Sequence, residues 1–128
     1  MNSTDTVRRS SLIMPVNQSR FVERAYTRGA DAIVLDLEDA VPPAEKGRAR
    51  SLVKDAIPVA SRGSADVFVC INKPVEMMVE DLDAAIHPGL TGLALAKVET
   101  ASWFVPMPSP PRKHGKPRPC VWQGWHEH

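Results

Sequence analysis

The fold is decided by Ala32–Pro43, which reads AIVLDLEDAVPP. The stretch begins as a continuous apolar run, typical of a parallel strand covered on both faces. It ends in the carboxylates of Asp36, Glu38 and Asp39, followed by two prolines that stop a strand. Because side chains alternate along a strand, Asp36 and Glu38 are expected on one face and Asp39 in the turn. Acidic groups at this end of a parallel strand indicate chemistry, although capping of the next helix or pairing with arginines remains an alternative.

Apolar runs and helical repeats alternate on both sides of this stretch. Further strands are expected at residues 11–16, 66–71 and 92–96. Ser19 is expected to cap a first helix that ends before Gly29, and Pro58 is expected to end a second helix that begins at Pro43. A third helix is expected over residues 76–86. Apolar stripes predict the buried helical positions as Phe21, Val22, Ala25 and Tyr26, then Ala49, Leu52, Val53, Ala56 and Ile57, then Met78, Leu82, Ala85 and Ile86.

Alternating strands and helices with short loops predict an α/β fold with a parallel sheet and right-handed crossovers. Four such units in about 90 residues match roughly the first half of a TIM (β/α)8 barrel, which typically needs ~250 residues. A four-stranded open α/β sheet is the competing architecture. No glycine-rich phosphate-binding pattern follows the first strand, which argues against a nucleotide-binding sheet.

The composition is that of an ordinary globular domain, with 128 residues, 43% hydrophobic and 24% charged. No apolar run of about 18 residues indicates a membrane span, and the N-terminus lacks an apolar signal core. Cys70 and Cys120 have no metal-site spacing and are too few for a disulfide framework. These features predict a reduced, cytoplasmic protein without a membrane partner.

The composition changes near Ala101, so we expect a partial barrel over residues 1–100 and an irregular, Pro-rich basic tail over residues 101–128. The tail contains 6 of the 12 prolines and all 3 tryptophans, and its 4 basic residues face 1 acidic residue. We expect it to be disordered or to result from a change of reading frame. Three alternative interpretations of the tail carry less weight. They are binding of a partner in an extended conformation, a nucleic-acid contact by Arg112, Lys113, Lys116 and Arg118, and a metal site of Cys120, His126 and His128. We expect no nucleic-acid partner.

Four segments in order carry a family resemblance: Arg8–Asn17 (RRSSLIMPVN), Arg28–Lys46, Val69–Asn72 (VCIN) and Leu95–Thr100 (LAKVET). They resemble the citrate lyase beta subunit family, also called the HpcH/HpaI aldolase or CoA-ester lyase family, over about residues 8–101. The resemblance implies a (β/α)8 barrel, usually a homo-oligomer, that acts on a small-molecule substrate. It implies retro-aldol or retro-Claisen cleavage of citryl-, malyl- or citramalyl-CoA thioesters or small 2-oxo acids. A base removes a hydroxyl proton, and Mg²⁺ holds the oxo-acid carboxylate and stabilises the developing negative charge.

The same resemblance implies roles for individual residues. Asp36, Glu38 and Asp39 would lie on the active-site rim, where they would order metal-bound water or orient the acid–base group; holding the exit loop of the strand is the structural alternative. Asn17 would contact the substrate or its phosphates, with a turn or capping role equally open. Lys97 occupies the matching lysine position, with an ordinary surface lysine as its alternative.

Three departures separate the chain from the family pattern. Cys70 stands where the family has an arginine that grips a carboxylate, and a thiol lacks that charged, bidentate fork. We expect Cys70 to be a buried residue rather than a nucleophile. Val16 replaces a frequent glycine. The metal-binding glutamate and aspartate of the family lie on its fifth and sixth strands, so Glu99, in the fourth-strand motif, is not assigned as a ligand.

These departures lead to two hypotheses. In the first, the chain is a lyase that is active only when further strands complete it. In the second, it is a non-catalytic fragment that serves as a binding or assembly partner of a complete lyase. Open strand edges would in either case favour self-association.

Overall fold

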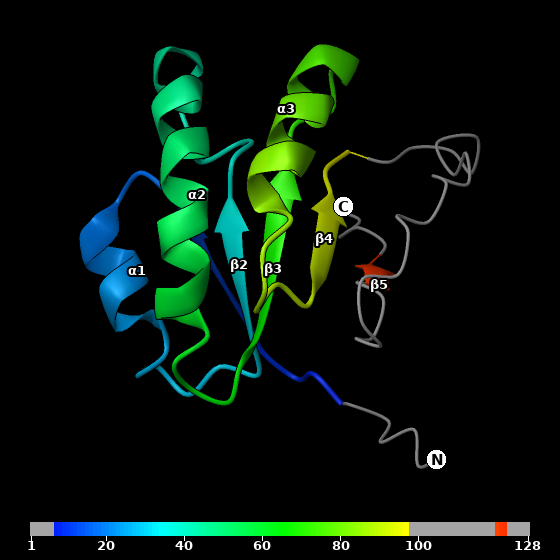
Figure 1. Cartoon of the computed structure of the whole chain (residues 1–128). Helices are drawn as coiled ribbons and strands as arrows, with labels where there is room; N and C mark the ends of the chain where they lie inside the picture. Colours follow the sequence, from blue (N-terminus) through cyan, green and yellow to red (C-terminus); the bar gives the residue numbers. More distant parts are fainter. Residues whose placement is uncertain (1–6, 98–119, 123–128) are drawn as a thin grey trace.

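A parallel sheet with its strands in sequence order is the centre of the molecule (Figure 1). The structure, a computed structural model, describes residues 7–97 and 120–122. The strands are β1 (Ser11–Pro15), β2 (Ala32–Asp36), β3 (Asp66–Ile71), β4 (Gly92–Leu95) and β5 (Cys120–Trp122). Each pairs in parallel with the next. The predicted α/β fold with four parallel strands from βα units is thereby confirmed.

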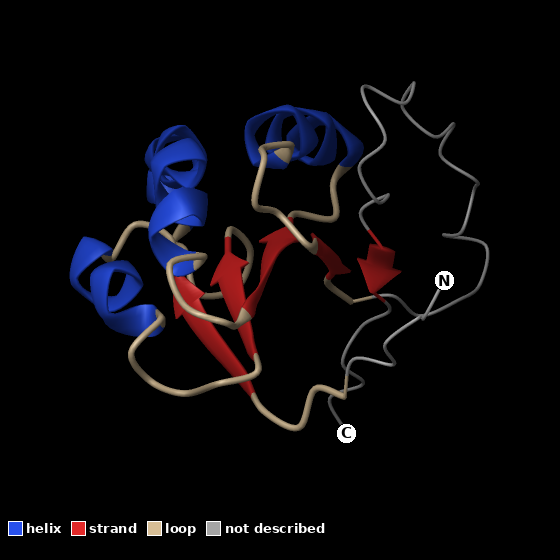
Figure 2. Ribbon diagram, turned by 60° about the horizontal axis from the view of Figure 1, so that its bottom comes forward, coloured by secondary structure: helices blue, strands red, loops and turns tan. Residues whose placement is uncertain are grey.

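Three helices and a short 3-10 turn cover one face of this sheet (Figure 2). They are α1 (Ser19–Ala25), η1 (Pro43–Glu45), α2 (Lys46–Ala60) and α3 (Val75–Ala85). Between them and the strands lies the main core, which contains fully buried Ile33, Leu35, Val53, Ile57, Val67 and Val69. A smaller cluster of Ala32, Val34, Phe68 and Ala94 lies on the other face. All five residues of β2 are buried, as its continuous apolar run predicts.

The register of the strands places their C-terminal ends level with one another. Pro15 of β1 is opposite Asp36 of β2, and Asp36 is opposite Cys70 of β3. The amide of Val16 continues the first pairing by donating to the carbonyl of Asp36 at 3.2 Å. The residues that follow β1, β2, β3 and β4 therefore meet along a single edge of the sheet.

The first helix is less buried than its apolar stripe predicts. Gln18, not Ser19, is its N-cap residue, and it makes no side-chain capping hydrogen bond. Val22 and Ala25 are buried, whereas Phe21 and Tyr26 are exposed. A seven-residue helix has about two turns, so one pair of residues at i and i+3 faces the core while its neighbours, rotated by about 100°, do not.

The ends of the longer helices also differ from expectation. α2 continues through Pro58 to Ala60, although proline lacks the amide hydrogen that a helix-interior residue donates. The next turn still closes, since the Ser61 amide donates to the Ile57 carbonyl at 3.0 Å. In the third helix, Ile86 lies one residue past the end of α3 and is exposed rather than buried.

The predicted tail lies outside the described residues apart from Cys120–Trp122. Those three residues form β5 and pair with β4 from Gly92 to Ala94, where no strand was expected. Three residues are too few to show a periodic pattern, and a sheet edge pairs through backbone groups that every sequence carries. Across residues 7–97 and 120–122, no helix has the length and hydropathy needed to cross a membrane.

Candidate functional site at the carboxyl ends of the strands

Asp36, the last residue of β2, shapes the loop that follows it. Its Oδ1 accepts a hydrogen bond from the Glu38 amide at 2.7 Å, and its Oδ2 accepts one from the Ala40 amide at 3.0 Å. The side chain is nearly buried, with 5% of its surface exposed. Both carboxylate oxygens are thus engaged by the backbone of their own loop, and β2 ends at Asp36 because the chain turns around this side chain.

The Lys97 ammonium lies between the other two carboxylates of the loop. Its Nζ is 2.7 Å from Oε1 of Glu38 and 3.0 Å from Oδ1 of Asp39. Lys97 follows β4, so this pairing reaches across β3 to the end of β2. The backbone of Lys97 is in the left-handed region with φ 54°, a conformation that costs a non-glycine residue of order 1 kcal/mol. The sequence predicted Glu38 and Asp39 on the rim and Lys97 as a substrate-binding residue, and the structure brings these three side chains together.

The charges of this cluster reinforce one another. The hydrogen bond from Lys97 holds the pKa of Asp39 below its usual value. In return, the hydrogen bonds to Glu38 and then to Asp39 raise the pKa of the Lys97 ammonium above its usual value. Glu38 is the sheltered member, because its side chain is 13% exposed while those of Asp39 and Lys97 are 69% and 56% exposed.

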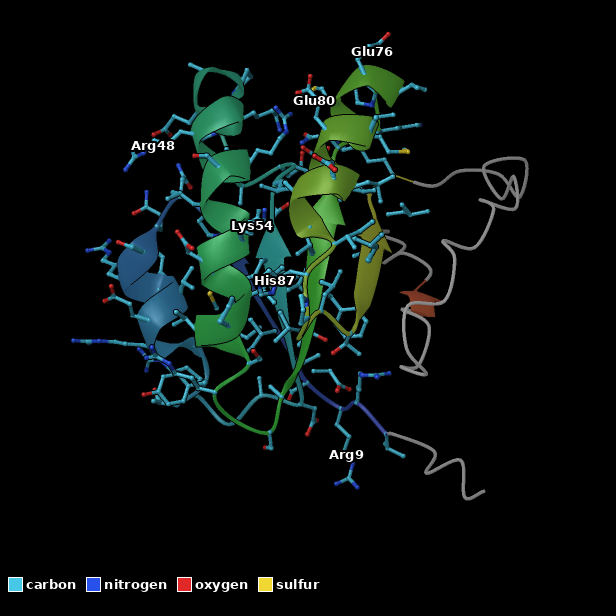
Figure 3. All side chains as sticks on the ribbon, viewed as in Figure 1. Arg9, Arg48, Lys54, Glu76, Glu80 and His87 are labelled. Atoms are coloured by element: carbon cyan, nitrogen blue, oxygen red, sulfur yellow. The ribbon has the colours of Figure 1, made fainter. Side chains whose placement is uncertain are left out.

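Removing the ammonium gives a direct test of this pairing. In Lys97→Met, we expect the pKa of Asp39 to rise toward its ordinary value, because its charged form loses the hydrogen bond that favours it. A depressed folded-state pKa stabilises the protein above the unfolded pKa, and this contribution disappears as the pH falls through the folded value. A carboxyl-carbon NMR titration measures the change. Lys54→Met, at an exposed position on α2 (Figure 3), is the matched control and should leave Asp39 unchanged.

Cys70 adds no charge to the site. Its side chain is partly buried on the face of the sheet that carries Val34 and Phe68. Burial, and then the negative charges of Asp36 and Glu38, raise the pKa of its thiol to about 12. Near neutral pH the group is therefore a neutral thiol, which neither attacks as a thiolate nor grips a carboxylate.

Asn17 follows β1 and lies apart from the lysine cluster. Its Nδ2 donates to Oε2 of Glu45 at 3.1 Å and so ties the end of β1 to η1. The side chain is buried, with 8% of the residue exposed, and its Oδ1 has no hydrogen-bond partner in the structure. That oxygen remains a hydrogen-bond acceptor for a ligand or for water.

Lys46 and Asn72 also lie near the site, and the sequence did not predict a functional role for them. Lys46 Nζ donates to the carbonyls of Leu37 and Glu38 at 3.1 and 2.8 Å, and to Oδ1 of Asn72 at 2.7 Å. Both residues lie in the segments that resemble the family, Arg28–Lys46 and Val69–Asn72, but neither their residue types nor their spacing predicted these contacts. A third residue, the buried Asp81 on α3, had a usable signal, because it falls at helical spacing between the apolar positions Met78 and Ala85.

The described carboxylates do not form a magnesium site. The oxygens of Asp36 accept backbone hydrogen bonds, and Glu38 and Asp39 each give an oxygen to Lys97. Within residues 7–97 and 120–122, no cluster of three or more His, Cys, Asp or Glu side chains is arranged to hold a metal ion. The Lys97 ammonium already pairs with two of these carboxylates, so the 37–40 loop alone does not fit a divalent cation.

Comparison with known proteins identifies relatives of one kind. The family model for HpcH/HpaI aldolase/citrate lyase matches residues 9–115. Citrate lyase subunit beta from Leuconostoc mesenteroides subsp. cremoris is 38% identical over 101 residues, which are 78% of this chain and 33% of that protein. A (3S)-malyl-CoA thioesterase from Cereibacter sphaeroides is 36% identical over 95 residues, 73% of this chain and 33% of that protein.

Solved structures agree with the sequence matches. The citrate lyase beta subunit from M. tuberculosis complexed with oxaloacetate and magnesium has a TM-score of 0.54 and 31% identity, over 72% of this chain and 40% of that one. CitE from Mycobacterium tuberculosis, complexed with the triphosphate group of ATP, gives 0.58 and 28% over 80% and 44%. The chain spans about a third of the length of the curated relatives it matches, and its coverage of 44% and 40% of the two solved chains fits about half a barrel. With matching segments, strand order and structural neighbours, the chain belongs to the HpcH/HpaI aldolase/citrate lyase family.

Proposed function

We propose that the chain carries part of the active site of a carbon–carbon bond lyase. The reaction is retro-aldol or retro-Claisen cleavage, and the substrates are citryl-, malyl- or citramalyl-CoA-type thioesters or small 2-oxo acids. The observation that carries the proposal is the meeting of Glu38, Asp39 and Lys97 at the carboxyl edge of a parallel sheet in barrel order. Barrels of βα units carry their chemistry at this edge. The relative named citrate lyase subunit beta supports the reaction class, and the relative named (3S)-malyl-CoA thioesterase supports a malyl-CoA-type thioester as substrate.

Each residue of the edge has a task in this proposal. Glu38 and Asp39 orient the group that takes the substrate's hydroxyl proton. As the carbon–carbon bond breaks, its electron pair becomes an enolate, and the Lys97 ammonium offsets the negative charge that develops. Asp36 holds the loop, and the free Oδ1 of Asn17 accepts a hydrogen bond from the substrate. Cys70 supplies no cation, so the carboxylate of the substrate must be bound by residues outside this set.

Ligand binding tests the assignment without requiring turnover. Oxaloacetate and malyl-CoA should each shift the NMR signals of Lys97 and Asp39 in a saturable way, and Lys97→Met should weaken binding by about tenfold, the effect of losing one charge-assisted hydrogen bond. Lys54→Met is the control that should bind as the unmodified chain does. Saturable binding that leaves the signals of Lys97 and Asp39 unmoved would exclude the edge as the site.

Turnover requires a second experiment. The 128-residue chain is assayed for acetyl-CoA release from malyl- and citryl-type thioesters with Mg²⁺, alone and after refolding with a polypeptide carrying the later strands of a citrate lyase beta subunit. We expect acetyl-CoA release only after refolding with the second polypeptide, because the described residues of this chain form no metal site. Release by the chain alone would show that it needs no further strands. If neither the chain nor the refolded mixture releases acetyl-CoA and the chain binds no ligand, the hypothesis of a non-catalytic binding or assembly partner is favoured.

Self-association and a reduced, cytoplasmic setting are part of the proposal. Cys70 is a free thiol, and Val75, Val79 and Ile86 expose more than 60% of their surface along and just after α3. Apolar groups so exposed favour association. We therefore expect analytical ultracentrifugation to detect a dimer or larger species whose fraction rises with protein concentration. A single monomer boundary at all concentrations, with a cooperative thermal transition, would contradict this expectation.

A further inference from the structure

Buried polar side chains extend from the space between α2 and α3 to the loop that carries Glu38. They begin at Asp81, which has no exposed surface. Its Oδ1 accepts a hydrogen bond from Nε of Arg50 at 2.8 Å, and its Oδ2 accepts two from Asn72, one from the backbone amide at 2.8 Å and one from Nδ2 at 2.7 Å. A carboxylate of α3 thereby fixes both the backbone and the side chain of the residue that follows β3.

Asn72 passes this order on to the loop. Its Nδ2 also donates to the carbonyl of Leu37 at 3.0 Å, and its Oδ1 accepts from Nζ of Lys46 at 2.7 Å. Lys46 donates in turn to the carbonyls of Leu37 and Glu38. Each of these contacts is a buried or partly buried hydrogen bond. Leaving a polar group unpaired at such a position costs free energy, so few alternative arrangements compete with this one.

The contacts end on the backbone of Glu38. The carbonyl of Glu38 is held by Lys46, and its amide is held by Oδ1 of Asp36. With both backbone groups fixed, the direction in which the Glu38 side chain leaves the loop is fixed as well. With the loop in this position, the carboxylates of Glu38 and Asp39 both contact Lys97.

We propose that Asp81 and Asn72 are positioning residues that hold the 37–40 loop so that its two carboxylates meet Lys97. Neither residue is hydrogen-bonded to the Lys97 ammonium. Asp81 lies on α3 and acts on the loop through Asn72. The importance of this positioning for turnover rests on the proposed lyase function, whereas the positioning itself is a property of the folded chain.

The test compares two aspartates on one helix. Asp81→Asn removes the charge that orients Asn72, while Asp83→Asn makes the same chemical change at an exposed position of α3. Asn72→Ala is the second variant, because it breaks the link to the loop and leaves the Arg50–Asp81 pair intact. In each full-length variant, the pKa of Asp39 is followed by carboxyl-carbon NMR at a temperature below the unfolding transition. This titration reports on the contact with Lys97, because the hydrogen bond from Lys97 is the main cause of the lowered pKa of Asp39.

We expect the pKa of Asp39 to rise toward its ordinary value in Asp81→Asn and in Asn72→Ala, and to stay unchanged in Asp83→Asn. An unchanged Asp39 in a folded Asn72→Ala variant would overturn the proposal, because a residue that only stabilises the fold lowers the melting temperature without moving this titration. If Asp39 shifts as expected but the chain binds none of the thioesters or oxo acids, the positioning stands and the lyase assignment fails. The two hypotheses therefore fail separately.

Discussion

Asp81→Asn is expected to lower the free energy of unfolding by about 3–5 kcal/mol, the cost typical of removing one partner from a buried ion pair. The substitution leaves the Arg50 guanidinium, whose side chain is 19% exposed, without the buried half of its pairing. It also turns an amide group toward hydrogen-bond donors of Arg50 or Asn72. The remaining contact of Arg50, with the exposed Glu80 at 2.6 Å, offsets little because a surface carboxylate is screened by solvent (Figure 3).

Urea denaturation of the purified chain measures this loss. Asp83→Asn serves as its control and should change stability by no more than about 0.5 kcal/mol, as is usual for an exposed substitution. Loss of stability by similar amounts in both variants would show that the asparagine on α3, rather than the buried pair, is responsible.

Ile33→Ala is expected to lower the free energy of unfolding by about 2–5 kcal/mol. Ile33 has no exposed surface and lies in β2, in the core between the sheet and the helices. Truncation removes three carbons from a site enclosed by strands on both sides, so the surrounding structure collapses only partly into the cavity. Urea denaturation with a fitted slope separates this loss from a change in the unfolded state.

A matched isoleucine on the neighbouring strand supplies the comparison. Ile13 of β1 is 51% exposed and points to the face without helices, so Ile13→Ala should cost less than about 1 kcal/mol. Equal losses at Ile13 and Ile33 would mean that the uncovered face of the sheet is buried in solution, as it would be in an oligomer.

The architecture followed from the sequence because apolar patterns alone specify it. The run in Ala32–Asp36 predicted a fully buried strand, and β3 has the predicted bounds, residues 66–71. The errors lie where a pattern is too short or a rule is local. α1 buries two residues rather than four, and Pro58 stands inside α2 instead of ending it.

The meeting of the strand ends was predictable from the sequence, whereas the contacts made there were not. The placing of Glu38, Asp39 and Lys97 on one edge follows from parallel strands that end level with one another. Lys97 pairs with both carboxylates from a left-handed backbone, a conformation that no sequence rule assigns to a lysine. The hydrogen bonds that connect Asp81 to the loop could not be predicted, because an acidic residue on a helix is usually exposed to solvent and the partners of Asp81 are distant in the sequence.

Glu38 is held by two different lysines, and each contacts a different part of the residue. Lys46 holds its backbone carbonyl from the side of the helices, and Lys97 holds its carboxylate from the side of β4. The position of this residue and the partner of its charge therefore come from different elements of the fold. An engineer wishing to move the carboxylate would vary Lys46 and its neighbours, whereas one wishing to free it for proton transfer would vary Lys97 and leave the loop in place.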